Sequence, residues 1–188
     1  MEMTPAILLR RSRWSETSLI VTWLSERWGT LRTVARGARR PGSAFAGRLD
    51  LFYGAEISIQ SSRSGDLHTL REVGGVTPFD AGRAGNAGFY LASYFAELSG
   101  LSAPPMHPAE EIYNLLGRGL AHLQVVPAGE LALRHFEREL CRILGIFDAA
   151  GKVSPQQALT ALCGSLPRSR SEALSLLSPK KSLAGPGD

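Results

Sequence analysis

The chain is poor in cysteine and lysine and has no long apolar run. Its only cysteines are Cys141 and Cys163, which are too few for a disulfide framework. No basic segment followed by an apolar stretch stands at the N-terminus, and no run of about 18 apolar residues occurs anywhere. We therefore expect a soluble protein of a reducing compartment, most simply the cytoplasm, with no membrane partner.

Sequence motifs for catalysis and metal binding are missing as well. The chain has no phosphate-binding loop of the Gly-x-x-x-x-Gly-Lys-Ser/Thr type, and no dinucleotide fingerprint follows an expected strand. The carboxylates of the N-terminal part lack the spacing of a metal-binding cluster: Asp50, Glu56, Asp66 and Glu72. We predict no catalytic residues, no cofactor and no metal site, so an enzyme acting on nucleic acid is the least favoured function.

Positive charge is concentrated near the N-terminus. The 188 residues have a net charge of +4, yet residues 1–50 hold nine arginines against four acidic residues. Residues 27–49 contain six arginines and no acidic residue, with Val34-Ala35-Arg36-Gly37-Ala38-Arg39-Arg40-Pro41-Gly42 at their centre. Guanidinium groups pair with phosphates in a bidentate manner and also stack on unpaired bases. The segment indicates a polyanion-binding loop, and a merely solvated basic loop is the alternative.

Apolar and β-branched residues recur in five short runs before residue 74. The runs are 6–11, 18–24, 30–35, 51–59 and 67–73, and turn-forming residues separate them. Five short strands without a long helix between them predict a small barrel of the oligonucleotide-binding (OB) kind. Trp23, Leu31, Val34 and Phe52 are expected in its core, whereas Arg32 is expected to point to solvent.

The apolar period becomes helical after Gly74-Gly75-Val76-Thr77-Pro78. Helices are expected around 89–96 and over 110–124, 130–144, 155–162 and 171–177. The predicted fold class is therefore α+β, with an N-terminal five-stranded OB-fold β-barrel followed by an all-helical C-terminal domain. We expect an OB-fold nucleic-acid-binding domain over 1–76, a helical domain over 77–178 and a disordered tail over 179–188.

Several short segments resemble the RecO family of bacterial recombination mediators. The N-terminal segments are Ala6-Ile7-Leu8, Glu16-Thr17-Ser18, Gly29 and Val34-Ala35-Arg36-Gly37-Ala38-Arg39-Arg40. Arg134-His135-Phe136-Glu137, followed by Leu144-Gly145, resembles the central helix of the family. The resemblance covers most of 1–147. It implies an OB barrel joined to a helical domain, in a non-enzymatic cytoplasmic protein that associates with the nucleoid.

The resemblance also implies DNA as the ligand and repair proteins as partners. The family binds single- and double-stranded DNA, anneals complementary strands, and works with RecR and the C-terminal tail of single-stranded DNA-binding protein to load RecA. Many members carry a four-cysteine zinc module after the Leu-Gly of the central helix, and this chain has no Cys-x-x-Cys pair. The alternative function is a protein-interaction module that docks a single-stranded DNA-binding protein or a RecR-like partner and binds little DNA itself.

The basic N-terminal segments supply the candidate nucleic-acid contacts: Arg10, Arg11, Arg32, Arg36, Arg39, Arg40, Phe45 and Arg48. Phe45 and Trp28 are candidates for base stacking, and Phe45 is favoured because arginines flank it. Arg10 and Arg11 either extend a groove or protect a sheet edge from pairing with another strand.

A basic stripe is expected on the third long helix, where arginines recur at i, i+4 and i+8. Together with the resemblance, this stripe predicts a docking site for an acidic peptide that ends in apolar residues. The candidate partner-binding residues are Arg134, Phe136, Arg138 and Arg142. Neutralisation of the stripe by Glu130 and Glu137 is the alternative.

Overall fold

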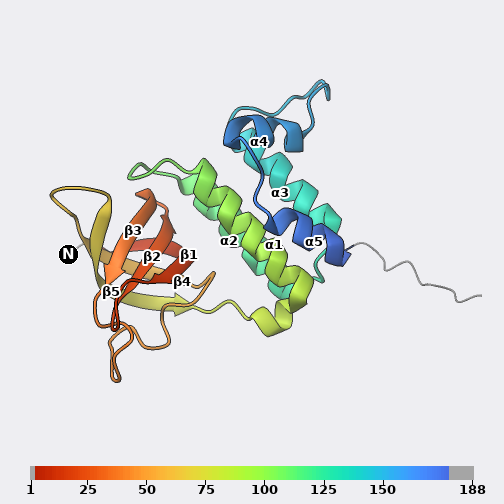
Figure 1. The fold of residues 1–188 in the computed structure, drawn as a ribbon. Coiled ribbons are helices and arrows are strands. Elements are labelled where there is room, and N and C mark those ends of the chain that lie inside the picture. Colours follow the sequence, from red (N-terminus) through yellow and green to blue (C-terminus); the bar gives the residue numbers. More distant parts are fainter. Residues whose placement is uncertain (1–2, 178–188) are drawn as a thin grey trace, which may run out of the picture.

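A computed structural model describes residues 3–177 and shows a β-barrel next to a group of helices (Figure 1). The strands are β1 (Thr4–Arg13), β2 (Leu19–Ser25), β3 (Gly29–Ala35), β4 (Gly54–Gln60) and β5 (Leu67–Thr77). They close in the order β1-β2-β3-β5-β4, with β4 antiparallel to β1 and only the short β3–β5 contact parallel. The predicted five-stranded barrel of the OB kind is confirmed.

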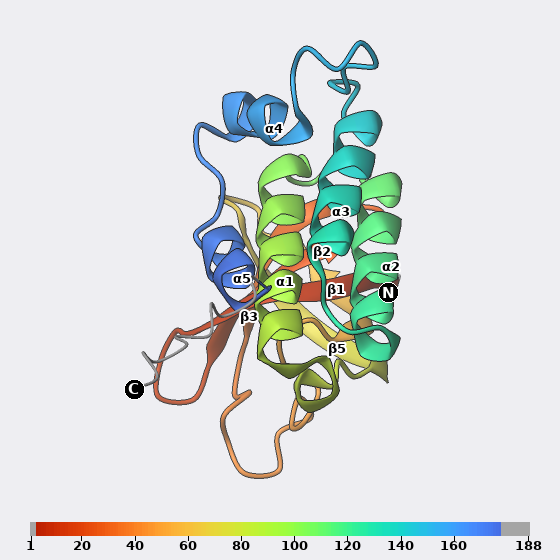
Figure 2. The same cartoon turned by 90° about the vertical axis from the view of Figure 1, so that its right-hand side faces the viewer.

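The helices follow the barrel as α1 (Ala81–Ser102), α2 (Glu110–Val125), α3 (Glu130–Ile143), α4 (Pro155–Cys163) and α5 (Ser169–Leu177). Helices α1 and α2 contact β1 and β2, whereas α3 packs on α2, and α5 packs on α1. Figure 2 shows the three long helices side by side over the barrel. The predicted helical C-terminal domain is thus confirmed, and the predicted disordered tail, 179–188, lies outside the described residues.

The fourth strand starts later than its apolar sequence predicts. Residues 51–53 form a turn, in which the amide of Tyr53 donates to the carbonyl of Asp50, and β4 begins only at Gly54. Phe52 adopts a left-handed backbone with φ +65° and is 4% exposed. Its ring packs edge-on against Phe79 and Phe89, at centroid distances of 5.3 and 5.7 Å. Phe52 is therefore apolar because it fills the interface between barrel and helices, not because it belongs to a strand.

Strand β1 has a continuous apolar run because both of its faces are covered. Ala6 and Leu8 point into the barrel core, while Ile7, between them, belongs to the core formed with the helices. The same division holds on β2, where Trp23 lies in the barrel core and Leu24, which pairs with Ile7, lies against the helices. Successive side chains on a strand point to opposite faces, so two-sided burial erases the usual polar alternation.

The connection between α1 and α2 joins the barrel at the start of β3, where Gly29 and Thr30 do not pair with β5. The amide of Thr30 donates to the carbonyl of Pro104 at 3.3 Å, and the amide of Met106 donates to the carbonyl of Thr30 at 3.2 Å. Gly29, with φ +56°, lies directly beneath this connection. The helices are thus attached by backbone hydrogen bonds as well as by apolar packing, which fixes their position relative to the barrel.

Candidate nucleic-acid interface

The basic segment forms an ordered loop between β3 and β4 that projects beyond the barrel (Figure 1). Successive turns stabilise it: the amide of Arg40 donates to the carbonyl of Gly37 at 3.0 Å, and the amide of Ser43 donates to Arg40 at 3.1 Å. Phe45 packs against the barrel core and Leu49 is 5% exposed. The loop therefore holds its arginines in defined positions relative to the barrel.

One side of this loop borders a groove of about 900 Å³, which we call the arginine groove. Three connections and parts of the three strands β3, β4 and β5 line it. Its residues are Trp14, Ser15, Thr17, Ser18, Val34, Arg36, Gly37, Arg40, Gln60, Ser61, Ser62, Arg63, Leu67, Thr69 and Arg71. The connections after the first and fourth strands are the ones with which OB-folds bind oligonucleotides. Both of them contribute to the arginine groove.

The arginine groove is positively charged without local compensation. Its lining contains four arginines and no aspartate or glutamate. Arg36, Arg40 and Arg63 are exposed and make no ion pair within the part of the chain that the structure describes, while Arg71 donates to the side-chain oxygen of Gln60. Free guanidinium groups converging on one groove suit phosphate oxygens, which accept two parallel hydrogen bonds from each of them.

Three of the predicted contact arginines instead hold the loop in place. Arg11 donates to the carbonyl of Leu49 at 2.6 Å and pairs with Asp50 at 3.1 Å. Arg39 donates to the carbonyl of Glu16 at 3.0 Å, and Arg48 donates to that of Val73 at 2.7 Å. Their hydrogen bonds link the loop to its surroundings, so part of their donor capacity is already used.

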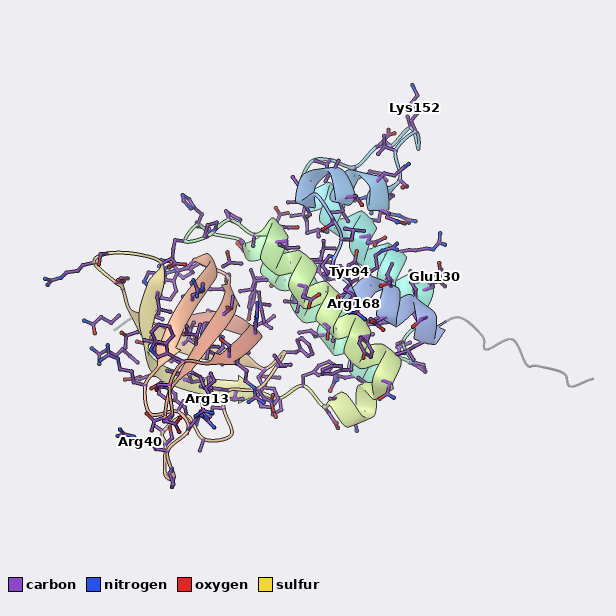
Figure 3. The ribbon with its side chains drawn as sticks, viewed as in Figure 1. Arg13, Arg40, Tyr94, Glu130, Lys152 and Arg168 are labelled. Carbon is purple, nitrogen blue, oxygen red and sulfur yellow. The ribbon has the colours of Figure 1, made fainter. Side chains whose placement is uncertain are left out.

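The eight predicted nucleic-acid residues are not brought together at one place. Arg36 and Arg40 lie in the arginine groove. A smaller cavity of about 480 Å³ on the other side of the loop is lined by three more predicted residues, Arg11, Arg39 and Phe45. Figure 3 shows Arg13 and Arg40 extending from the end of the barrel that is remote from Tyr94 in the helices.

Arg10 and Arg32 face a third region, a groove of about 1210 Å³ between the barrel and α1, which we call the interdomain groove. Arg32 pairs there with Asp66 at 2.8 Å. The hydrogen bond from Arg32 lowers the pKa of this carboxyl below its usual value. The charge of Arg32 is thus compensated within the protein, unlike that of Arg36 or Arg40.

Three of the four predicted partner-binding residues on α3 lie at the surface, and the fourth is buried. Arg134 pairs with Glu130 at 2.6 Å, Arg142 pairs with Glu139, and Arg138 is exposed. The fourth predicted residue, Phe136, is 2% exposed and stacks on Phe95 at a centroid distance of 4.0 Å. The surface part of this prediction therefore consists of its three arginines.

Three groove residues with an aromatic or guanidinium side chain were absent from the predicted site: Trp14, Arg63 and Arg71. Arg71 and Thr69 are two residues apart on a strand, so they share its outward face. The alternation of this strand in the sequence could therefore have identified Arg71 as an outward-facing residue. Arg63 lies in the Ser-Ser-Arg-Ser-Gly turn between β4 and β5. OB-folds bind oligonucleotides with this connection, so the predicted fold was the only signal that could have identified Arg63. No signal in the sequence places Trp14 closer to the loop than Trp28.

The cysteines are not arranged as metal ligands. Within residues 3–177, no three histidine, cysteine, aspartate or glutamate side chains converge as a metal site requires. Cys141 is buried and its thiol donates to the carbonyl of Pro155 at 3.6 Å. Burial raises the pKa of Cys141 to about 11 and also raises that of Cys163. Both side chains are therefore held as neutral thiols, whereas metal coordination requires thiolates.

This burial predicts different reactivity of the two thiols. At pH 8, a thiol with the pKa of Cys141 is ionised in roughly one molecule in 1,000. We expect Ellman's reagent to modify half-buried Cys163 in the folded protein, as the more rapid phase, and buried Cys141 only after denaturant is added. The variant Cys163→Ser should then show no rapid phase, whereas two equal rapid phases in the folded wild type would contradict this arrangement.

The fold and the groove together define an OB-fold protein with a helical domain and an arginine-lined groove. Residues 1–79 match the family model described as Recombination protein O N terminal. The chain is 32% identical to DNA repair protein RecO of Anaeromyxobacter dehalogenans over 84% of its own length, and 36% identical to that of Dechloromonas aromatica over 75%. These matches show that the chain is similar to RecO proteins.

The chain spans about half the length of the relatives that it matches. It covers 59% of the Anaeromyxobacter protein, 58% of the Dechloromonas protein and 45% of the Synechococcus elongatus DNA repair protein RecO, to which it is 36% identical. Within residues 3–177, no helix has the length and apolar character needed to cross a bilayer.

Proposed function

We propose that this protein is a DNA-binding mediator of DNA repair and recombination. It binds single- and double-stranded DNA, anneals complementary strands and assists recombinase loading, without making or breaking covalent bonds. The observation that carries the proposal is the arginine groove, which is free of acidic residues and lies between two connections that OB-folds use for oligonucleotides. The relatives' description as DNA repair protein RecO supports the same process.

Annealing follows from the electrostatics of such a groove. Two DNA strands repel each other through their phosphates, and this repulsion opposes pairing. Arginines that neutralise phosphates release counterions and lower the repulsion, without reading the edges of the bases. Binding of this kind tolerates any sequence and needs no nucleotide hydrolysis.

The proposed protein partners are a RecR-like protein and the C-terminal tail of a single-stranded DNA-binding protein. The helical domain presents Arg134, Arg138 and Arg142 along one exposed face of α3, and arginines of this kind suit an acidic peptide. The pair of Arg134 with Glu130 is solvent-exposed, and that of Arg142 with Glu139 is partly exposed. Pairs of this kind are weak and can exchange for a partner's carboxylates.

A second candidate function is a protein-interaction module with little DNA binding of its own. The interdomain groove favours it, because Leu101 and Met106 line that groove and are 60% and 40% exposed. Exposed apolar side chains that gather in a groove are typical of protein contacts. The two candidates differ in whether the arginine groove is needed for binding to DNA.

The test is fluorescence anisotropy of a labelled single-stranded oligonucleotide over a range of salt concentrations. If the four groove arginines each contact a phosphate, the affinity should fall with salt at a log–log slope of about −3. The double charge reversal Arg36→Glu/Arg40→Glu should lower the affinity by roughly 100-fold at low salt, since two charge-assisted hydrogen-bonded contacts are lost.

The matched control is Arg83→Glu/Arg118→Glu, which makes the same change in net charge at two exposed arginines of α1 and α2. It should reduce the affinity only weakly and leave the salt slope unchanged. Equal loss in both variants would mean that overall charge alone attracts DNA. Absence of binding by the wild type at low salt would exclude the mediator proposal in favour of the interaction module.

A further inference from the structure

Trp14 is the one large apolar side chain of the barrel that is exposed, among the described residues. It is 59% exposed, whereas Trp23 is fully buried and donates its ring N–H to Thr33, and Trp28 packs against the barrel core. A protein contact normally requires a contiguous apolar patch, and Trp14 has none around it on the barrel. Most other residues of the arginine groove are arginines and small polar residues, and its two aliphatic side chains are covered in part or in full, since Val34 is buried and Leu67 is half-buried.

The turn that carries Trp14 is held rigidly against the basic loop. The amide of Trp14 donates to the carbonyl of Ser18 at 3.0 Å, and the hydroxyl of Ser18 accepts from the amide of Gly37 at 3.3 Å. The amide of Arg39 donates to Thr17 at 2.9 Å, while its guanidinium donates to Glu16. The backbone of Trp14 is therefore held beside the loop before any ligand arrives, which lowers the entropy cost of binding.

The position of Trp14 among free guanidinium groups combines the two elements of single-strand recognition. Arg36, Arg40 and Arg63 suit consecutive phosphates, and an indole offers an aromatic face to an unpaired base. In a duplex, the faces of the bases are already covered by their neighbours, so only an unpaired strand can use both elements. Arginines alone would bind either form of DNA.

We propose that Trp14 is the base-stacking residue of the arginine groove and makes that groove selective for unpaired DNA. The inference rests on the proposed DNA-binding function and adds the form of DNA that the groove prefers. Arg39 acts as a positioning residue, because it links the turn that carries Trp14 to the basic loop instead of facing the groove.

The test separates base stacking from phosphate binding by removing the bases from the ligand. Oligo-deoxythymidine and an abasic strand of the same length carry the same phosphates. The wild type should bind the thymidine strand about 10-fold more tightly, the size of a single base stack. Trp14→Ala should bind both strands with the affinity that the wild type has for the abasic one, and Trp14→Phe should retain part of the preference.

Intrinsic fluorescence provides a second readout from the same samples. The thymidine strand should quench the wild-type emission, and the quench should be lost in Trp14→Phe, because the two remaining tryptophans are buried or half-buried. An unchanged melting temperature of the variants confirms that the fold is intact. A wild type without preference for the thymidine strand, or a Trp14→Ala variant that keeps it, would overturn the role of Trp14 and leave phosphate binding standing. Failure of both strands to bind would overturn the proposed function together with it.

Discussion

Replacing Arg170 by alanine is expected to destabilise the protein by about 3–5 kcal/mol, because it leaves a buried carboxylate without its counter-ion. Glu137 on α3 is 3% exposed, and its carboxylate accepts from Arg170 at 2.7 Å and from the hydroxyl of Tyr94 on α1 at 2.6 Å. Arg170 comes from α5, so this one cluster connects three helices. Burial, together with the charge of Glu137, also raises the pKa of Tyr94, which keeps its hydroxyl protonated as a donor.

The molecule offers a matched control two residues away. Arg168 pairs with Glu172 at 3.0 Å, but its side chain is 89% exposed, whereas that of Arg170 is 16% exposed. Exposed pairs of this kind contribute little, so Arg168→Ala should change the free energy of unfolding by less than about 1 kcal/mol. Urea denaturation followed by circular dichroism measures both variants.

The double variant Glu137→Met/Arg170→Met tests the physical reason. Replacing a buried ion pair by apolar residues of similar length is often close to neutral, since the cost of dehydrating both charges disappears with them. We therefore expect the double variant to be much more stable than Arg170→Ala. Equal stability of Arg170→Ala and Arg168→Ala would show that the buried pair does not hold α5 in place.

This cluster connects three helices of a domain that lacks the four-cysteine zinc module of many RecO proteins. After Leu144-Gly145 the chain runs through α4 to α5, and α5 returns to pack on α1. The hydroxyl of Ser169 at the start of α5 donates to Glu97 on α1 at 2.6 Å, beside the Arg170–Glu137 pair. Side-chain hydrogen bonds and ion pairs thus hold the end of the described chain against α1 and α3.

The barrel was predictable because local signals agree with the global fold. Short β-branched runs separated by turn-forming residues specify strands, and five of them without intervening helices leave few arrangements other than a small barrel. The start of β4 was predicted wrongly for a tertiary reason. Leu51 and Phe52 are apolar in order to pack against residues near α1, and an apolar run by itself does not show which partner will cover it.

The composition of the groove was less predictable, because adjacent arginines take opposite directions. Arg39 and Arg40 are neighbours in the sequence, yet one donates to the turn before β2 and the other is free in the arginine groove. The turn geometry of the loop determines the direction of each arginine side chain, whereas the sequence shows only that both residues are charged. Arg63 and Arg71 belong to the β4–β5 hairpin and reach the same groove because β5 pairs in parallel with β3, so their contribution depends on strand pairing over a long sequence separation.

Replacing Gly29 by alanine is expected to separate the helices from the barrel edge. Gly29 has φ +56°, and a Cβ atom there would lie 2.0 Å from the carbonyl oxygen of Pro104 and 2.5 Å from that of His107. Both are backbone atoms, so no side-chain rotation relieves the overlap, and the α1–α2 connection must move. The left-handed conformation alone costs about 1–2 kcal/mol for a residue with a side chain, and the lost hydrogen bonds across β3 add to it.

The signature of this change is local, and amide hydrogen exchange measures it. The amides of Thr30, Met106 and Ala109 donate across the junction, to the carbonyls of Pro104, Thr30 and Glu26. In Gly29→Ala these three amides should lose protection, while amides inside the barrel, such as that of Val21 on β2, keep theirs.

Gly42 provides the control that separates backbone strain from overlap. It has φ +72° in the basic loop, and a Cβ atom there would meet nothing within 4 Å. Gly42→Ala therefore carries the same conformational cost without the collision and should leave the three junction amides protected. If Gly29→Ala were no more destabilising than Gly42→Ala, the α1–α2 connection would have to be soft enough to move aside. The backbone hydrogen bonds to Thr30 would then not be what fixes the helices against the barrel.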